Sequence, residues 1–433
     1  MKPIKYSPMR VCALLLLPVV LIAIWLVWAN RNPDIDQPSV PSTNRTQQIA
    51  RGEYLSRAGN CMSCHTARGG NSYAGGRAVP TPFGTIYTSN LTSDRTTGIG
   101  NWTAGDFWQA MHDGRSKDGS LLYPAFPYTN FTKVTREDSD AIFAYLQTIP
   151  AVQQKNIEPE LRFPYNQRVL LYAWRAMYFR PGQYANDTRQ SVEWNRGAYL
   201  TQGLGHCSAC HTTRDSFGGT DLKAELGGGM IPMLNWYAPP LNGDKQAGLG
   251  NWETAQLAAF LQTGVSPHRA VSGPMAEVVS GSLQHLKHED ITAMSVYIKS
   301  LPQQIAPPVR TADSLRMEEK KAILERGQKI YDNQCATCHQ AAGEGVAGIY
   351  PTFSGDNAVA SPFATNAIRI VLNGGYPPST SGNPRPYGMP PFGQTLNDEE
   401  VASVVSYIRN TWGNQAGMVS TSEVNRYRSR QGE

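Results

Sequence analysis

One pentapeptide pattern that could bind a cofactor occurs three times in this sequence. The pattern is C-x-x-C-H, and its copies begin at Cys61, Cys207 and Cys335. Two thiols three positions apart lie on one helical turn, where both can bond to the vinyl groups on one edge of a porphyrin. The adjacent histidine can then supply the proximal nitrogen to the iron. The sequence therefore predicts three covalently bound haem c groups, with the binding residues Cys61, Cys64, His65, Cys207, Cys210, His211, Cys335, Cys338 and His339.

The flanking sequence argues against two other uses of paired cysteines. The three copies use six of the seven cysteines. A zinc site would need a second ligand pair close to each copy, and a thioredoxin-like dithiol would need a βαβ pattern around it; neither is present. The remaining Cys12 lies in an apolar run, where it suits the role of a small buried hydrophobic residue.

Each haem iron needs a second axial ligand, and Met sulfur is the usual one in c-type electron carriers because it raises the reduction potential. In the third repeat, Met389 lies in a Pro-rich stretch, and in the second repeat Met275 holds the same place. Met230 and Met233 compete with Met275 but come earlier in the repeat. The predicted iron ligands are therefore His65, His211, Met275, His339 and Met389.

The first repeat departs from this pattern. Phe126 stands where the methionine is expected, and phenylalanine cannot ligate iron. Met111 and His112, which end a predicted helix just before Gly114, are two possible substitutes. The alternative is that His112 is a solvated residue at a helix end, where a cation is favourable, and that the iron is five-coordinate or water-bound. The sequence leaves the sixth ligand of the first haem open.

Helices at both ends of each repeat are expected to position these residues. An Arg-Gly pair, at Arg51, Arg196 and Arg326, marks an opening helix about ten residues before each haem motif. Closing amphipathic helices are expected at Asp140–Thr148, Asp290–Ser300 and Glu399–Asn410, each with acidic residues at its start. An opening and a closing helix packed across each other around a haem is the cytochrome c arrangement, and strand-like alternation is scarce. We therefore expect an all-α fold with three tandem cytochrome c domains behind one N-terminal transmembrane helix.

The expected segments follow from these repeats and from the composition between them. They are a membrane anchor or signal segment over 1–32, a linker over 33–48, domains over 49–160, 191–303 and 318–413, an interdomain helix and linker over 161–190, a second linker over 304–317 and a flexible tail over 414–433.

The N-terminal segment has the pattern of a membrane anchor. Lys2, Lys5 and Arg10 precede an apolar run of 18 residues, Val11–Trp28. As a helix this run would be about 27 Å long, close to the thickness of a bilayer core. A cleaved signal peptide is the alternative, but no small-x-small cleavage site follows the run. Either way the basic residues stay in the cytoplasm, so we expect an inner-membrane protein with its haem domains in the periplasm.

A second apolar and aromatic segment, Tyr165–Arg180, lies between the first two repeats and contains three arginines. One interpretation is a helix that packs the first two domains together. The other is a surface that touches a membrane or a partner, because cationic aromatic helices favour interfaces.

The composition excludes several function classes. The net charge of +5 is mild and spread along the chain, without a basic run or stripe, so we expect no nucleic-acid partner. Rossmann, P-loop, nucleophile-elbow and metalloprotease motifs are all missing. The chain is therefore not expected to be an enzyme on its own, since haem supplies the electron chemistry and the protein sets potentials and spacing.

Three runs, Thr81–Thr92, Gly98–Thr103 and Asp118–Ala125, carry a resemblance that extends along most of the chain. The sequence resembles the tri-haem cytochrome c subunit of bacterial membrane-bound dehydrogenases. The resemblance implies a large catalytic dehydrogenase subunit as partner and ubiquinone as electron acceptor.

The run Pro124–Tyr128 looks most like cytochromes paired with molybdenum hydroxylases that act on aldehydes and related substrates. The alternatives are a quinoprotein alcohol or flavin gluconate-type dehydrogenase as partner, or a free-standing membrane-tethered carrier that feeds a terminal oxidase. A multihaem peroxidase or reductase with an open iron at the first haem is a further possibility.

Overall fold

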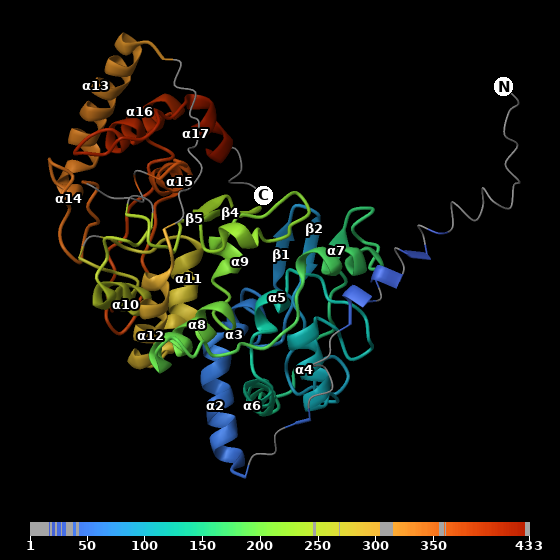
Figure 1. The fold of residues 1–433 in the computed structure, drawn as a ribbon. Coiled ribbons are helices and arrows are strands. Elements are labelled where there is room, and N and C mark those ends of the chain that lie inside the picture. The colour runs from blue at the N-terminus through green and yellow to red at the C-terminus, as the bar shows by residue number, and fades with distance from the viewer. Residues whose placement is uncertain are drawn as a thin grey trace, which may run out of the picture.

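The computed structural model describes residues 17, 20–21, 24–26, 28–31, 38–39, 43–245, 248–267, 269–303, 315–354, 359 and 361–428. Helices predominate, and three helical domains follow one another along the chain (Figure 1). Most of the predicted anchor Val11–Trp28 lies outside the described residues. Among the described residues, no helix combines the length and the apolar character that crossing a bilayer would require.

Each domain has an opening helix, a short helix at the haem motif and a closing helix. The first domain contains α2 (Arg45–Ala58), α3 (Cys61–Cys64), α4 (Ala104–Asp113), α5 (Tyr128–Phe131) and α6 (Arg136–Leu146), and α7 (Leu170–Tyr178) follows it. The second contains α8 (Val192–Gln202), α9 (Ser208–His211), η1 (Leu222–Ala224), α10 (Thr254–Thr263), α11 (Pro274–Gly281), η2 (Leu283–His285) and α12 (His288–Ser300). The third contains α13 (Met317–Gln334), α14 (Ala336–His339), α15 (Thr365–Asn373), α16 (Asp398–Arg409) and α17 (Thr421–Arg428).

The glycine of each Arg-Gly pair lies where the opening helix crosses the closing helix. A Cβ atom on Gly52 or Gly197 would lie 1.9 Å from a backbone oxygen of the closing helix, and one on Gly327 would lie 2.2 Å from such an oxygen. No side chain fits there, so the glycine permits the close crossing of α2 on α6, α8 on α12 and α13 on α16.

The closing helices begin earlier than the acidic residues alone predicted. α6 begins at Arg136 rather than at Asp140, because the Thr135 side chain accepts a hydrogen bond from the Asp138 amide and caps the helix. α12 begins two residues and α16 one residue before the predicted starts. In α16, Asn397 and Glu400 form a reciprocal capping box.

Two small antiparallel sheets correct the all-α expectation. In the first domain, β1 (Ala78–Thr81) pairs with β2 (Gly84–Tyr87), which also pairs with β3 (Glu160–Leu161). In the second, β4 (Gly229–Ile231) pairs with β5 (Trp236–Ala238). Strands of two to four residues are too short to produce a recognisable alternation, so the sequence pattern gave no sign of them.

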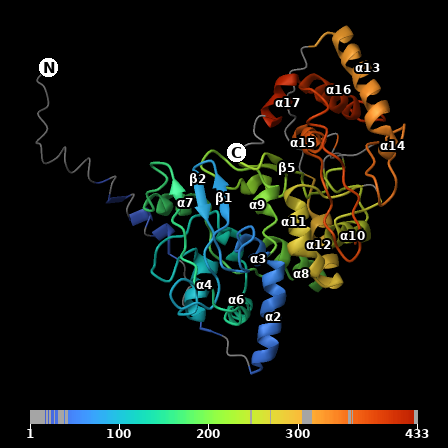
Figure 2. The ribbon, with the colours of Figure 1, turned by 180° about the vertical axis from the view of Figure 1, so that it is seen from behind.

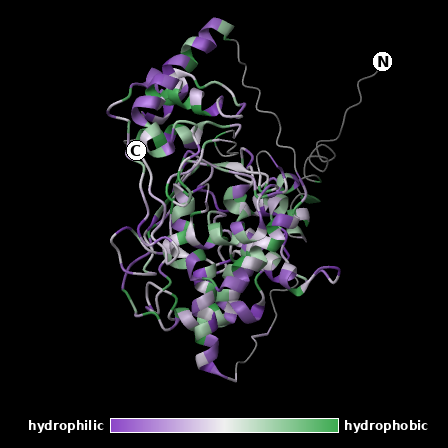
Figure 3. Cartoon of the chain, turned by 90° about the vertical axis from the view of Figure 1, so that its left-hand side faces the viewer, coloured by the Kyte–Doolittle hydropathy of each residue, from purple (hydrophilic) through white to green (hydrophobic). Residues whose placement is uncertain are grey.

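The first two domains share one hydrophobic core, whereas the third has its own. Buried residues of both domains, from Leu55 to Ile298, form the shared core. A second core contains only residues of the third domain, from Tyr331 to Tyr427. Viewed from behind, α2 to α12 form one body with the third domain above it (Figure 2). Figure 3 shows α13, at the top of the molecule, mostly in the colour of hydrophilic residues.

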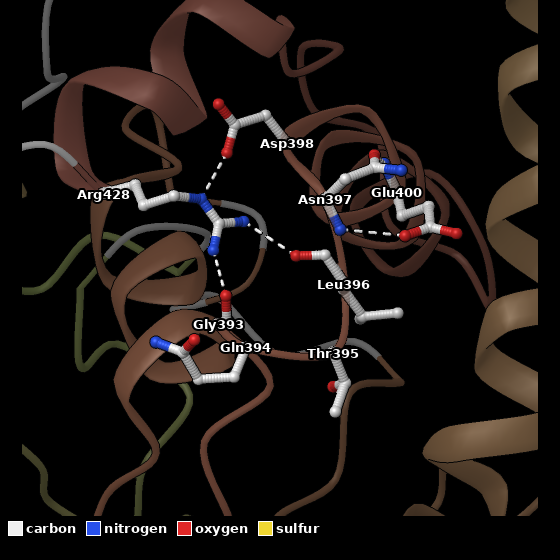
Figure 4. Close-up of a pocket in the computed structure, with 8 residues that line it drawn as sticks. All are labelled: Gly393, Gln394, Thr395, Leu396, Asn397, Asp398, Glu400 and Arg428. Carbon is white, nitrogen blue, oxygen red and sulfur yellow. Dashed lines mark hydrogen bonds and ion pairs between the residues drawn. The ribbon is translucent and has the colours of Figure 1, made fainter.

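The predicted flexible tail is instead largely part of the third domain. Val424 and Tyr427 of α17 are buried in its core. Arg428 donates hydrogen bonds to the carbonyls of Gly393 and Leu396 and forms an ion pair with Asp398 (Figure 4). This packing could not be predicted from the sequence, because α17 is short and mostly polar and buries only two apolar side chains, three residues apart.

The interdomain helix α7 is shorter than the predicted segment Tyr165–Arg180. It contacts both of the first two domains. Arg175 pairs with Asp113 of the first domain at 2.8 Å, and Tyr178 donates to Asp215 of the second at 2.6 Å.

Candidate haem sites

The cysteines and histidine of each haem motif lie on a single helical turn. The backbone amides of His65, His211 and His339 each donate to the carbonyl of the first cysteine of the motif, at 2.9 Å in all three. This turn places both thiols and the imidazole on one short element, as attachment to one porphyrin requires.

A backbone carbonyl orients each of the three imidazoles. The Nδ1 atoms of His65, His211 and His339 lie 2.7, 2.6 and 3.0 Å from the carbonyl oxygens of Ser89, Pro239 and Pro351. A carbonyl can only accept, so Nδ1 carries the proton in each ring and Nε2 keeps its lone pair for a metal. The same arrangement at three separate sites fits a proximal haem ligand.

The surroundings of the imidazoles favour the form that binds iron. Burial lowers the pKa of His65, His211 and His339, while the hydrogen bond to the carbonyl raises it, and the net change is downward. The neutral ring is therefore stabilised, and neutral imidazole is the ligating state.

The thiols do not have the properties of a redox dithiol. Burial raises the pKa of Cys61 and Cys207 to about 12 and that of Cys335 to about 11. Reactive C-x-x-C thiols have lowered pKa values instead. Among the residues that the structure describes, no group of three or more His, Cys, Asp or Glu is placed to hold a metal ion.

The two predicted axial methionines occupy different kinds of backbone. Met389 is on a loop tied to the end of α15, where its amide and carbonyl both bond to Gly375, at 2.8 and 3.1 Å. Met275 is in the first turn of α11. The Met275 side chain packs against the shared core of the first two domains, and the Met389 side chain packs against the core of the third. Met233 is 51% exposed at the tip of the β4–β5 hairpin, which makes it a poorer candidate. Ligation by Met275 and Met389 remains a prediction.

In the first domain, the structure changes the role expected for His112. This residue is fully buried, so the alternative in which it is a solvated residue at a helix end is wrong. Its ring stacks on Trp108 with centroids 4.1 Å apart, and its Nδ1 lies 3.4 Å from the Thr132 hydroxyl. Met111 belongs to the shared core, against which Phe126 also packs.

An arginine that the sequence analysis missed connects the first two haem sites. Arg77, just before β1, donates to the carbonyl of Ser63 inside the first haem motif at 2.6 Å and pairs with Glu277 in α11. Glu277 is two residues from Met275. The first two haem sites therefore adjoin at the domain interface.

The interface between the first two domains is reciprocal. Arg51 pairs with Asp138 of its own domain, and Tyr199 of the second domain donates to the same carboxylate at 2.6 Å. We call this contact and its counterpart the tyrosine clasp. In the counterpart, Arg196 pairs with Asp290, and Tyr54 of the first domain donates to Asp290 at 2.6 Å. These residues occupy equivalent positions in the two repeats, so the clasp has approximate twofold symmetry.

Comparison with known proteins agrees with this geometry. A family model described as "Cytochrome c" matches residues 49–150, 196–302 and 324–412. The chain belongs to the cytochrome c family. Each matched segment contains one of the three C-x-x-C-H motifs.

Several relatives that are similar over most of the chain are cytochrome subunits of dehydrogenases. The gluconate 2-dehydrogenase cytochrome c subunit of Pantoea cypripedii is 38% identical over 395 residues, covering 87% of this chain and 88% of the relative. The cytochrome c subunit of alcohol dehydrogenase (quinone) from Gluconacetobacter polyoxogenes is 37% identical over 400 residues, 88% of this chain and 84% of the relative. The fructose dehydrogenase cytochrome subunit of Gluconobacter japonicus is 34% identical over 414 residues, which cover 90% of this chain and 84% of the relative. This cytochrome is thus an electron-transfer subunit of the dehydrogenase type and not a catalytic subunit.

Proposed function

We propose that this cytochrome accepts electrons from a dehydrogenase of the gluconate, quinone-dependent alcohol or fructose type and delivers them to ubiquinone. The observation that carries the proposal is the threefold recurrence of a carbonyl-oriented histidine beside two cysteines, in a chain similar over most of its length to such subunits. The relatives support this class of partner better than the molybdenum hydroxylase expected from the sequence.

Three haem c groups fit the residues present. The cysteine pairs would hold them covalently, His65, His211 and His339 would supply the proximal nitrogen, and Met275 and Met389 would supply sulfur to the second and third. When bound, haem supplies the one-electron chemistry. The chain contributes the orientation of the imidazoles, the exclusion of water by its cores and the close approach of the first two sites.

We infer a cellular location from the N-terminal sequence alone. The run Val11–Trp28, with basic residues before it, would hold the chain in the inner membrane with the haem domains in the periplasm. This location would bring the domains close to ubiquinone in the same membrane.

A molybdenum hydroxylase is the second candidate partner. Phe126, in the run Pro124–Tyr128, is the observation that favours it. The cofactor of the catalytic subunit that co-purifies in gentle detergent decides between the two classes.

The experiment that tests the proposal has three readouts on one preparation. The mass of the denatured chain should exceed the peptide mass by three haem units. A catalytic subunit should co-purify, and its substrate should reduce the haems, which a soluble ubiquinone analogue should reoxidise. A mass increment of two haems or fewer in matured protein, or haems that the co-purified enzyme cannot reduce, would overturn the proposal.

A further inference from the structure

The segment 162–178 exposes large apolar side chains that the described part of the chain leaves uncovered. Residues 162–170 are all exposed. Phe163 is 80% exposed, Val169 69%, Leu170 45% and Met177 50%. Leu170 and Met177 are seven residues apart and so lie on one face of α7. An apolar surface of this kind generally marks a binding site.

The opposite face of α7 is fixed to the protein. Leu171 and Ala176 are buried, and Arg175 is held by its ion pair with Asp113. The Trp174 indole donates to the Phe217 carbonyl of the second domain at 3.0 Å. The exposed side chains therefore cannot turn inward without breaking these contacts.

The N-terminal apolar run ends against this same helix. Asn30 donates to the Tyr172 carbonyl at 3.0 Å and accepts from Arg175 Nε at 2.9 Å. Ile24 and Trp28, just before it, are 60% and 69% exposed. Figures 1 and 2 both show α7 beside the described part of the N-terminal segment. The two apolar surfaces are therefore neighbours.

The charge of the segment indicates what covers it. Residues 161–186 contain four arginines and no aspartate or glutamate. Three of these arginines, Arg162, Arg168 and Arg180, are exposed. Exposed apolar and aromatic side chains flanked by cations suit the boundary between headgroups and acyl chains of an anionic membrane.

We propose that residues 162–170 and the outer face of α7 lie in the headgroup region of an anionic phospholipid membrane, as a second contact beside the N-terminal run. This inference rests on the proposed membrane attachment. Because α7 is bonded to both of the first two domains, the contact would hold that pair in one orientation on the membrane surface.

Spin labelling of the full-length haem-loaded protein tests this contact. Cys12→Ser removes the one cysteine outside the haem motifs, and Val169→Cys then accepts a single nitroxide. Val192→Cys is the matched control, since Val192 is 89% exposed at the start of α8, away from α7. On vesicles of phosphatidylglycerol and phosphatidylethanolamine, the accessibility of position 169 to oxygen relative to a water-soluble nickel complex should rise several-fold. Position 192 should not change.

The other outcomes overturn the proposal in distinguishable ways. If the protein sediments with the vesicles but position 169 stays as open to nickel as position 192, the N-terminal run alone makes the attachment. If position 169 loses nickel access only after the catalytic subunit is added, the surface binds a protein. If the chain does not sediment with vesicles, the proposed membrane attachment fails as well.

Discussion

The predicted iron ligands Met275 and Met389 can each be tested by a single substitution. Met389→His should lower the reduction potential of the third haem, because a second imidazole favours the ferric state more than the Met sulfur does. The drop should be a sizeable part of the ~0.8 V range that axial ligands span. Met275→His should do the same to the second haem. Redox titration of the full chain measures both, and Met317→Leu, at a residue 77% exposed, is the control. Unchanged titrations in both His variants would refute the ligand assignment.

The first haem should behave differently from the other two. Phe126 offers no ligating atom, and His112 is held in its stack on Trp108. We therefore expect the reduced protein to bind carbon monoxide at one haem per chain, seen as a shift of about one third of the Soret absorbance. Phe126→Met should abolish the binding, while Phe163→Met, at an exposed phenylalanine, should leave it unchanged. A wild-type chain that binds no carbon monoxide would mean that Met111, His112 or another side chain fills the site.

The sequence could predict those site residues that lie close together along the chain. Cys61, Cys64 and His65 were predictable because their spacing within one turn is itself the requirement. The carbonyl partners of the histidines, such as Ser89, were not, since any residue offers a carbonyl. Arg77 was also missed, because its role depends on Glu277, which lies 200 residues away.

At the scale of elements, the tyrosine clasp fixes the helices of the first two domains against each other. Tyr199→Phe removes the hydrogen bond to Asp138, whose side chain is 2% exposed. A hydrogen bond to a charged group contributes about 2 kcal/mol, so the free energy of unfolding of the domain pair should fall by about that amount in denaturant titrations. Tyr376→Phe, at a residue 71% exposed, should change it by less than about 0.5 kcal/mol. Equal effects of the two changes would show that the clasp adds no stability.

The other half of the clasp should respond to acid. Burial raises the pKa of Asp290, but hydrogen bonds from Arg196 and Tyr54 lower it more, so the net pKa lies below its ordinary 3.8. The folded state thus binds fewer protons than the unfolded state. The resulting stability is present above about pH 4 and is lost as the pH falls through the folded-state pKa. Asp290→Asn should lower stability at pH 7 and flatten its decline below about pH 4, whereas Asp332→Asn, at an exposed residue of α13, should do neither.

Long helices that recur in each repeat could be predicted from the sequence, whereas short elements could not. The opening and closing helices follow from the Arg-Gly pairs and the acidic starts, and the structure has all six. The hairpins and α17 were missed because these elements are short and are stabilised only by contacts with the rest of the domain. α17, for example, depends on the hydrogen bonds of Arg428 to the loop before α16.

For the whole molecule, the two cores divide the chain into a double domain and a single one. The third domain lacks the tyrosine of the clasp, since Lys329 takes its place and is exposed. It contacts the second domain through hydrogen bonds between the backbone of Tyr237 and the Asn366 side chain, at 2.8 and 2.9 Å. The Tyr237 ring also packs against Phe363, with centroids 4.9 Å apart. The sequence repeats predicted three tandem domains but not the shared core, because a repeat does not reveal which surfaces are shared.

This division predicts how fragments of the chain fold. Residues 43–303 contain the whole shared core and both halves of the clasp, so that fragment should mature with two haems and unfold in one transition. Residues 315–428 should mature alone with one haem. Residues 43–160 would expose the apolar half of a shared core, so that fragment should aggregate or lose haem, although its motif and closing helix are complete. Mass spectrometry and thermal unfolding of the three fragments measure this. A fragment 43–160 as stable as the same domain within 43–303 would show that the domains are independent and that the clasp only holds them side by side.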